Sequence, residues 1–104
     1  MSHVFYMKTG DTAPSIEATL KKNGVPIDLT DATAVRFKMG DQLDEAAVIV
    51  SPATSGQVRY DWGANDADVA GVYDAEFEIT WTGGGVQTVP SKGFIRVYIE
   101  DDLD

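Results

Sequence analysis

Three acidic side chains recur at every second position in one stretch of the sequence, at Asp74, Glu76 and Glu78. Two carboxyl groups at a suitable separation perform glycoside hydrolysis, one as the acid and the other as base or nucleophile. A spacing of two places all three acids on one face of a β-strand. Acids that alternate with apolar residues are more typical of a solvated face, where they pair with basic residues across neighbouring strands. The basic residues that we expect opposite them are Arg36 and Lys38, or Arg59 and Arg96.

A second group of polar residues lies within one short segment and consists of Asp61, Asn65, Asp66 and Asp68. Oxygen ligands of this kind suit Ca²⁺, but an EF-hand loop needs Gly at its sixth position and Glu at its twelfth, and this spacing does not match. Asp61, Asp66 and Asp68 are therefore weak calcium candidates. Turn formation and helix capping are the more ordinary roles of such residues, and we assign no metal and no cofactor to the chain.

Nucleophilic catalysis needs a nucleophile with a base within reach. The chain has no cysteine, and its single histidine, His3, stands close to the N-terminus. The glycine run Gly83–Gly85 is followed by Val86, so it lacks the Lys-Ser/Thr pair of a phosphate-binding loop and reads as a hairpin tip. We therefore expect no catalytic residues and predict that the protein is not an enzyme.

The charge balance is acidic, with 17 acidic and 8 basic residues and a formal net charge of -9. Nucleic acids and anionic membranes attract basic surfaces, so neither is an expected partner. No apolar stretch approaches the ~20 residues that cross a bilayer, and the first residues show no signal-peptide pattern. With 104 residues, the chain has the length of one domain, and we assign residues 1–104 to it.

Apolar and polar residues alternate over five runs, which is the pattern of strands with one buried and one wet face. The runs are 16–20, 35–39, 58–62, 73–81 and 95–99. The pair Asn23-Gly24 is a strong hairpin signal. The pattern predicts an all-β fold, an immunoglobulin-like antiparallel β-sandwich of about seven to eight strands. Residues 1–9 form an N-terminal strand or arm in this interpretation, and residues 100–104 an acidic tail.

Helix is expected only as single turns, at 41–47 and at 64–70, the second capped by Asn65 or Asp66. The segment Asp68–Tyr73 resembles the tyrosine corner of immunoglobulin-like sandwiches, in which the Tyr hydroxyl bonds to upstream backbone. A plain glycine-containing turn before a strand is the alternative.

Adjacent aromatic residues near the N-terminus suggest an interface. A regular strand cannot bury both Phe5 and Tyr6 on one face. Tyr98 alternates out of phase with its apolar neighbours in the run 95–99, so it is expected to face outward. Phe5, Tyr6 and Tyr98 are therefore the interface candidates. The alternative is an edge strand that is buried on both sides.

Three segments in order resemble a phage family. They are Gly10–Leu20, Gly24–Met39 and Gly71–Thr80, followed by Val89-Pro90 and Phe94–Val97. This arrangement is similar to the immunoglobulin-like domain at the N-terminus of phage baseplate upper proteins and to small related tail proteins. The likeness runs from about Gly10 to Ile99. Baseplate upper proteins are longer than this chain, and the family pattern supplies no catalytic or ligand residue to carry over.

The resemblance implies a non-catalytic virion structural protein of a bacteriophage tail or baseplate, made in the host cytoplasm. Its implied partners are other tail or baseplate proteins and identical copies of itself. The alternative is a carbohydrate- or cell-surface-binding immunoglobulin-like module. In that case exposed rings of Trp62, Trp81 or Tyr98 would stack on sugars.

Overall fold

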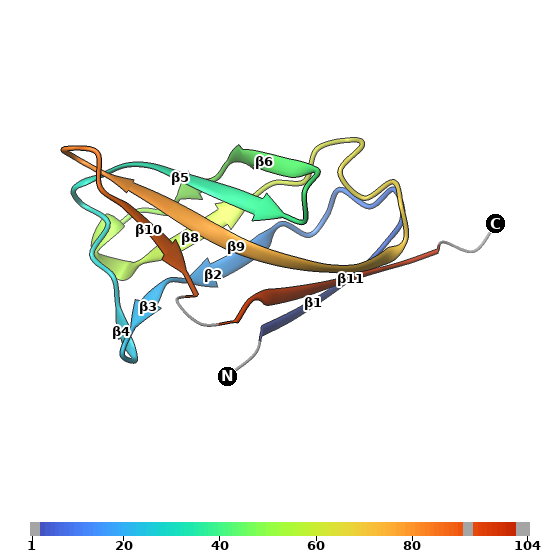
Figure 1. Cartoon of the computed structure of the whole chain (residues 1–104), viewed down its shortest axis with the longest axis horizontal. Coiled ribbons are helices and arrows are strands. Elements are labelled where there is room, and N and C mark those ends of the chain that lie inside the picture. The colour runs from blue at the N-terminus through green and yellow to red at the C-terminus, as the bar shows by residue number, and fades with distance from the viewer. Residues whose placement is uncertain (1–2, 91–92, 102–104) are drawn as a thin grey trace.

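Two β-sheets pack face to face in the computed structural model of the chain, which describes residues 3–90 and 93–101 (Figure 1). The large sheet has six strands in the order β1-β11-β9-β5-β6, and β10 pairs with β9 outside this path. Its strands are β1 (His3–Lys8), β5 (Ala32–Met39), β6 (Leu43–Ala46), β9 (Gly71–Trp81), β10 (Val86–Val89) and β11 (Ile95–Glu100).

The small sheet has three strands in the order β2-β8-β7. These are β2 (Ile16–Thr19), β7 (Val48–Ile49) and β8 (Gln57–Tyr60). A separate hairpin joins β3 (Lys21–Lys22) to β4 (Val25–Pro26), and one 3-10 turn, η1 (Ala53–Ser55), precedes β8. The buried apolar residues of both sheets form one core, so the predicted all-β sandwich is confirmed.

The two sequence-predicted turns lie where the sequence places them. Asn23 and Gly24 connect β3 to β4 with φ values of 54° and 80°, the left-handed conformation that a two-residue hairpin of this type requires. The run Gly83–Gly85 connects β9 to β10, and the N–H of Trp81 donates to the carbonyl of Gly85 at 2.7 Å. Both hairpins are thus encoded by local residue choice.

One strand pair departs from the predicted antiparallel arrangement. β1 runs parallel to β11, with Phe5 opposite Val97 and Tyr6 opposite Tyr98. After β1 the chain crosses to the small sheet at β2, and it returns to the large sheet long before β11 begins. Because no short hairpin joins β1 to β11, nothing forces them to run in opposite directions.

The predicted helical turn at 41–47 is wrong. The chain reverses at residues 40–42 and continues as β6, in which Leu43 lies opposite Met39 of β5. Leu43 is buried in the core while Asp44 and Glu45 are exposed. Burial of one leucine together with cross-strand hydrogen bonds therefore outweighs the helical preference of a short acidic segment.

The predicted helical turn at 64–70 is also wrong, because this segment forms hydrogen-bonded turns without a helix. The carboxylate of Asp66 accepts the N–H of Gly63 at 2.6 Å and the hydroxyl of Tyr60. Local side-chain bonds of this kind compete with helix formation. The turns lead Ala67 into the core, and its carbonyl accepts the N–H of Gly10 at 2.9 Å.

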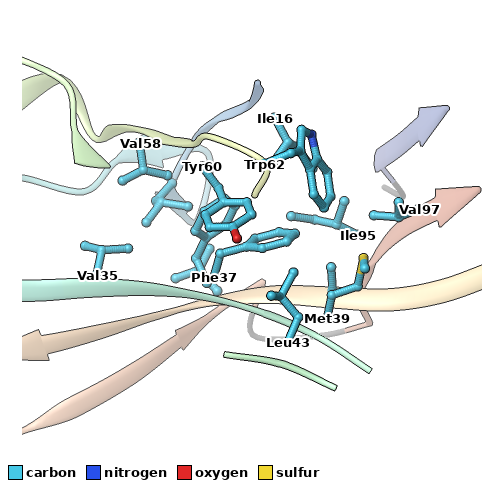
Figure 2. Close-up of a cluster of buried hydrophobic side chains, with 14 of the residues drawn as sticks. Ile16, Val35, Phe37, Met39, Leu43, Val58, Tyr60, Trp62, Ile95 and Val97 are labelled. Carbon is cyan, nitrogen blue, oxygen red and sulfur yellow. The ribbon is translucent and has the colours of Figure 1, made fainter. Parts of the chain in front are cut away.

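An aromatic cluster occupies the centre of the core. Phe37 is fully buried, and its ring centroid lies 4.8 Å from that of Tyr60, 5.1 Å from that of Phe77 and 5.5 Å from that of Trp62. Figure 2 shows Phe37 and Tyr60 side by side, with Trp62 next to them. Burial raises the pKa of the Tyr60 hydroxyl, and its bond to Asp66 raises it further, so this group stays a neutral donor.

The tyrosine corner is confirmed. The hydroxyl of Tyr73 donates to the backbone carbonyl of Val69 at 2.7 Å. Tyr73 is half-buried, and its ring also packs close to Gly71 at the start of β9. The bond therefore ties the 61–70 loop to the longest strand of the large sheet.

Replacing Tyr73 with phenylalanine is expected to lower the free energy of unfolding by about 0.5–1.5 kcal/mol, the net contribution of one such hydrogen bond. Urea denaturation followed by tryptophan fluorescence measures the change. The matched control is Tyr6→Phe, because Tyr6 is 68% exposed. Equal unfolding midpoints for the Tyr73→Phe variant and the wild type would show that the corner bond does not stabilise the fold.

Candidate protein interface

An apolar row crosses three strands on the outward face of the large sheet. Tyr6 of β1 lies opposite Tyr98 of β11, which in turn lies opposite Val72 of β9. Tyr6 and Val72 are 68% and 56% exposed, whereas Tyr98 is half-buried beneath the ring of Tyr6 at a centroid distance of 5.1 Å. Val4, 46% exposed, adjoins Tyr6 on the same face of β1. We call Tyr6, Tyr98 and Val72 the outer apolar row.

Ion pairs flank the outer apolar row on both sides. Lys8 contacts Glu100 at 3.0 Å on one side, and Arg96 contacts Asp74 at 2.8 Å on the other. Exposed pairs of this kind add little to stability. They do neutralise the charges next to the row, so the row has an apolar centre and a polar rim, as protein interfaces do.

The structure separates the three interface candidates. Phe5 points inward, where it is half-buried and packs on Trp62 at a centroid distance of 5.8 Å. Tyr6 and Tyr98 stack together on the outward face. The alternative of a strand buried on both sides is wrong, because Tyr6 is exposed. Val72 was not among the candidates, although its spacing of two from Asp74 already placed it on the outer face.

Two of the three alternating acidic residues of β9, Asp74 and Glu78, form cross-strand ion pairs, as expected. Glu78 contacts Lys38 at 2.9 Å, and this hydrogen bond raises the pKa of the Lys38 ammonium group. The second ion pair, between Asp74 and Arg96, belongs to the polar rim of the outer apolar row. These contacts match a solvated charged face.

Two of the expected basic residues form ion pairs with other acids. Arg36 lies opposite Glu78, as expected, but it donates to Asp44 of β6 at 2.7 Å, and this hydrogen bond holds the pKa of the Asp44 carboxyl below its usual value. Arg59 lies in β8 of the small sheet and pairs with Asp61 at 2.8 Å, so its predicted position opposite β9 is wrong. The alternating pattern assigns a face to each side chain and leaves the choice of sheet open.

The weak calcium candidates bond to different protein groups. Asp61 accepts hydrogen bonds from Ser15 and from Arg59, and these bonds lower the pKa of its carboxyl. Asp66 is engaged by Gly63 and Tyr60, as described above, and Asp68 is exposed. Within residues 3–90 and 93–101, no three His, Cys, Asp or Glu side chains group closely enough to hold a metal ion.

The aromatic residues considered for sugar stacking are mostly covered. Trp62 is 5% exposed, so its expected role as an exposed ring is wrong. β8 ends at Tyr60, and the chain then folds Trp62 over Phe37 into the core. Trp81 is half-buried, and its Nε1 donates to Gln87 at 3.1 Å.

The N-terminal strand includes the single histidine, since the backbone of His3 pairs with Ile95 in β11. No helix in the described ranges is long and apolar enough to cross a membrane.

One protein family matches the chain over almost its whole length. The model of the BppU N-terminal domain family covers residues 2–103 and therefore every residue that the structure describes. The match includes all three segments on which the resemblance to phage baseplate upper proteins rests. None of the curated proteins matches the chain.

Proposed function

Since the chain belongs to the BppU N-terminal domain family, a family of phage baseplate structural proteins, we propose that it is a non-catalytic component of the phage tail or baseplate. It acts by binding other tail or baseplate proteins, it assembles with copies of itself, and it resides in the virion after synthesis in the host cytoplasm. Neither nucleic acid nor membrane is among its partners.

The outer apolar row supports this proposal. Tyr6, Tyr98 and Val72 lie directly opposite one another across three strands, so they form one continuous strip and not scattered exposed residues. Continuous apolar strips with polar rims mark protein-binding surfaces, and tyrosine is prominent among residues that dominate binding energy. The net charge of -9 favours a partner whose contacting surface is neutral or basic.

The carbohydrate-binding alternative has less support from the side chains. It requires exposed aromatic rings, and Trp62 is buried in the core. One face of the Tyr98 ring is stacked against Tyr6. A partner protein that covers both tyrosines at once fits this arrangement better than a sugar ring inserted between them.

Placing two charges in the outer apolar row is expected to prevent assembly. In phage that carry the double variant Val72→Lys, Tyr98→Lys, the amount of this protein per purified particle should fall at least ~10-fold, because buried unpaired charges at an interface cost several kcal/mol. Quantitative mass spectrometry of gradient-purified particles measures this amount. Both substituted residues lie outside β1, on the solvent-exposed face of the large sheet.

The matched control is the double variant Val25→Lys, Val86→Lys. These valines are 63% and 60% exposed and lie in other hairpins. Particles with this variant should carry the protein at the wild-type level. The proposal fails if wild-type particles lack the protein, or if the outer-row variant folds and is incorporated as well as the wild type.

A further inference from the structure

β1 is paired on one side only in the described part of the chain. It has six residues and is the longest strand at a sheet edge, since β2, β6 and β10 have four each and β7 has two. An open strand edge offers a row of backbone donors and acceptors to another strand.

The direction of these backbone groups follows from one hydrogen bond. The N–H of Thr9 donates to the carbonyl of Glu100 at 2.8 Å, so residue 9 faces β11. Backbone groups of successive strand residues point to opposite sides. Residues 5 and 7 therefore also face β11, while Val4, Tyr6 and Lys8 face the open edge.

Asp11 covers one end of this edge. Its carboxylate accepts the N–H of Lys8 at 3.0 Å, and its own N–H donates to the carbonyl of Lys8 at 3.1 Å. The backbone groups of Val4 and Tyr6 are the edge-facing groups that remain for a second strand. They are two residues apart, with Phe5 between them.

We propose that two copies of this chain pair antiparallel through β1, about a two-fold axis at Phe5. Val4 of each copy then lies opposite Tyr6 of the other, and the two residues exchange both of their backbone hydrogen bonds. The two large sheets become one continuous sheet. This inference rests on the proposed function and deepens it, because it names the contact between identical copies.

The charge distribution favours a second copy as the occupant of this edge. Two copies with a net charge of -9 each repel one another. Residues 3–8 contain no acidic side chain, so repulsion is weak along β1. Of the other edge strands, β2 carries Glu17 and β6 carries Asp44 and Glu45, while β7 and β10 have no acid but are shorter than β1.

The side chains fit the same register. A valine opposite a tyrosine on one face is a favourable aromatic and β-branched pair. The outer apolar rows of the two copies then join into one strip. A pairing register shifted by one residue would move every side chain of the strand to the opposite face of the sheet. A register shifted by two residues toward the C-terminal end would require the backbone groups of Lys8, which already bond to Asp11.

Disulfide cross-linking tests this register. The chain has no cysteine, so introduced cysteines react only with one another. A mixture of Val4→Cys and Tyr6→Cys proteins should form a linked dimer under mild oxidation, because directly opposite residues lie about 5.5 Å apart at Cα. Each variant alone should link several-fold less, and Val25→Cys, at an exposed position in β4, serves as the control. Equal linking of the single variants and the mixture would overturn the register.

Light scattering over a wide concentration range tests the dimer itself. The wild type should dimerise, and Val4→Pro should raise the dissociation constant at least ~10-fold, because each copy loses one N–H···O bond. Proline at this position removes an edge-facing N–H and leaves the bonds to β11 in place. Unchanged far-UV circular dichroism checks the fold.

The control Val25→Lys should dimerise like the wild type, since Val25 is 63% exposed in β4 and lies outside both the β1 edge and the outer apolar row. A wild-type protein that remains monomeric at every concentration would overturn the inference. The proposed function would then be decided separately, by the amount of the protein in purified particles.

Discussion

The Phe37→Ala variant is expected to lose about 3–5 kcal/mol of unfolding free energy. Phe37 is fully buried and contacts the rings of Tyr60, Trp62 and Phe77, which come from two distant parts of the chain. Its removal leaves a cavity between the two sheets. It also removes ring contacts that add about 0.5–1.5 kcal/mol per pair beyond area burial.

This loss is large for a domain of such size, because single domains are stable by only about 5–15 kcal/mol. Urea denaturation of the purified variant measures it, with tryptophan fluorescence as the probe. The control is Phe94→Ala, since Phe94 is 48% exposed and its truncation should change the unfolding free energy by less than about 0.5 kcal/mol. Similar losses in both variants would show that the aromatic cluster does not dominate stability.

Replacing Gly56 with alanine is expected to cost about 2–5 kcal/mol of unfolding free energy, from two effects that add. Gly56 has a φ of +72°, where an L-residue pays about 1–2 kcal/mol. A Cβ at this position would lie 2.9 Å from the carbonyl oxygens of Leu20 and Ile27, which are backbone atoms with little freedom to move. Overpacking of this kind adds about 1–3 kcal/mol. The carbonyl of Gly56 also accepts the N–H of Leu20 at 2.8 Å, so any shift weakens that bond.

A glycine of similar backbone conformation provides the control. Gly24 has a φ of +80°, and a methyl group added there would have no atom within 4 Å, so Gly24→Ala should cost only about 1–2 kcal/mol. The difference in unfolding free energy between the two variants, measured by urea denaturation, isolates the close backbone approach at Gly56. Equal losses would mean that the approach relaxes at no cost.

Stability and assembly depend on opposite faces of the same strands. On β1, Phe5 packs inward on Trp62, while Tyr6 contributes to the outer apolar row. On β11, the buried Val97 precedes Tyr98 in the same way. Substitutions at core positions should therefore reduce folding, and those at Tyr98 and Val72 should reduce binding without loss of the fold.

Strand positions and local turns followed directly from residue order. The alternating runs at 73–81 and 95–99 lie within β9 and β11, because the period of two is a property of the backbone itself. The Asn23-Gly24 hairpin and the tyrosine corner at Tyr73 were also predictable, since each depends on residues close together in the chain. The three segments Gly10–Leu20, Gly24–Met39 and Gly71–Thr80, taken in their order along the chain, were also sufficient to indicate the phage family.

Pairing between distant segments was not predictable in this way. Arg59 was among the alternatives expected to face the charged residues of β9, but it lies in the other sheet. The acidic segment at 41–47 was expected to be helical and instead pairs with β5. In both cases the local pattern has more than one acceptable partner, and burial of apolar side chains across the whole core selects among them.

The sequence by itself determined that the chain is an acidic, cysteine-free β-sandwich with one wet face per strand, because composition and alternation are properties of neighbouring residues. Only the tertiary structure decided that β1 lies parallel to β11, which aligns Tyr6, Tyr98 and Val72 in one row. It also decided that Trp62 is buried and that Val4 and Tyr6 point their backbone groups to an open edge. The physical reason is that register between strands distant in sequence depends on the packing of the entire core.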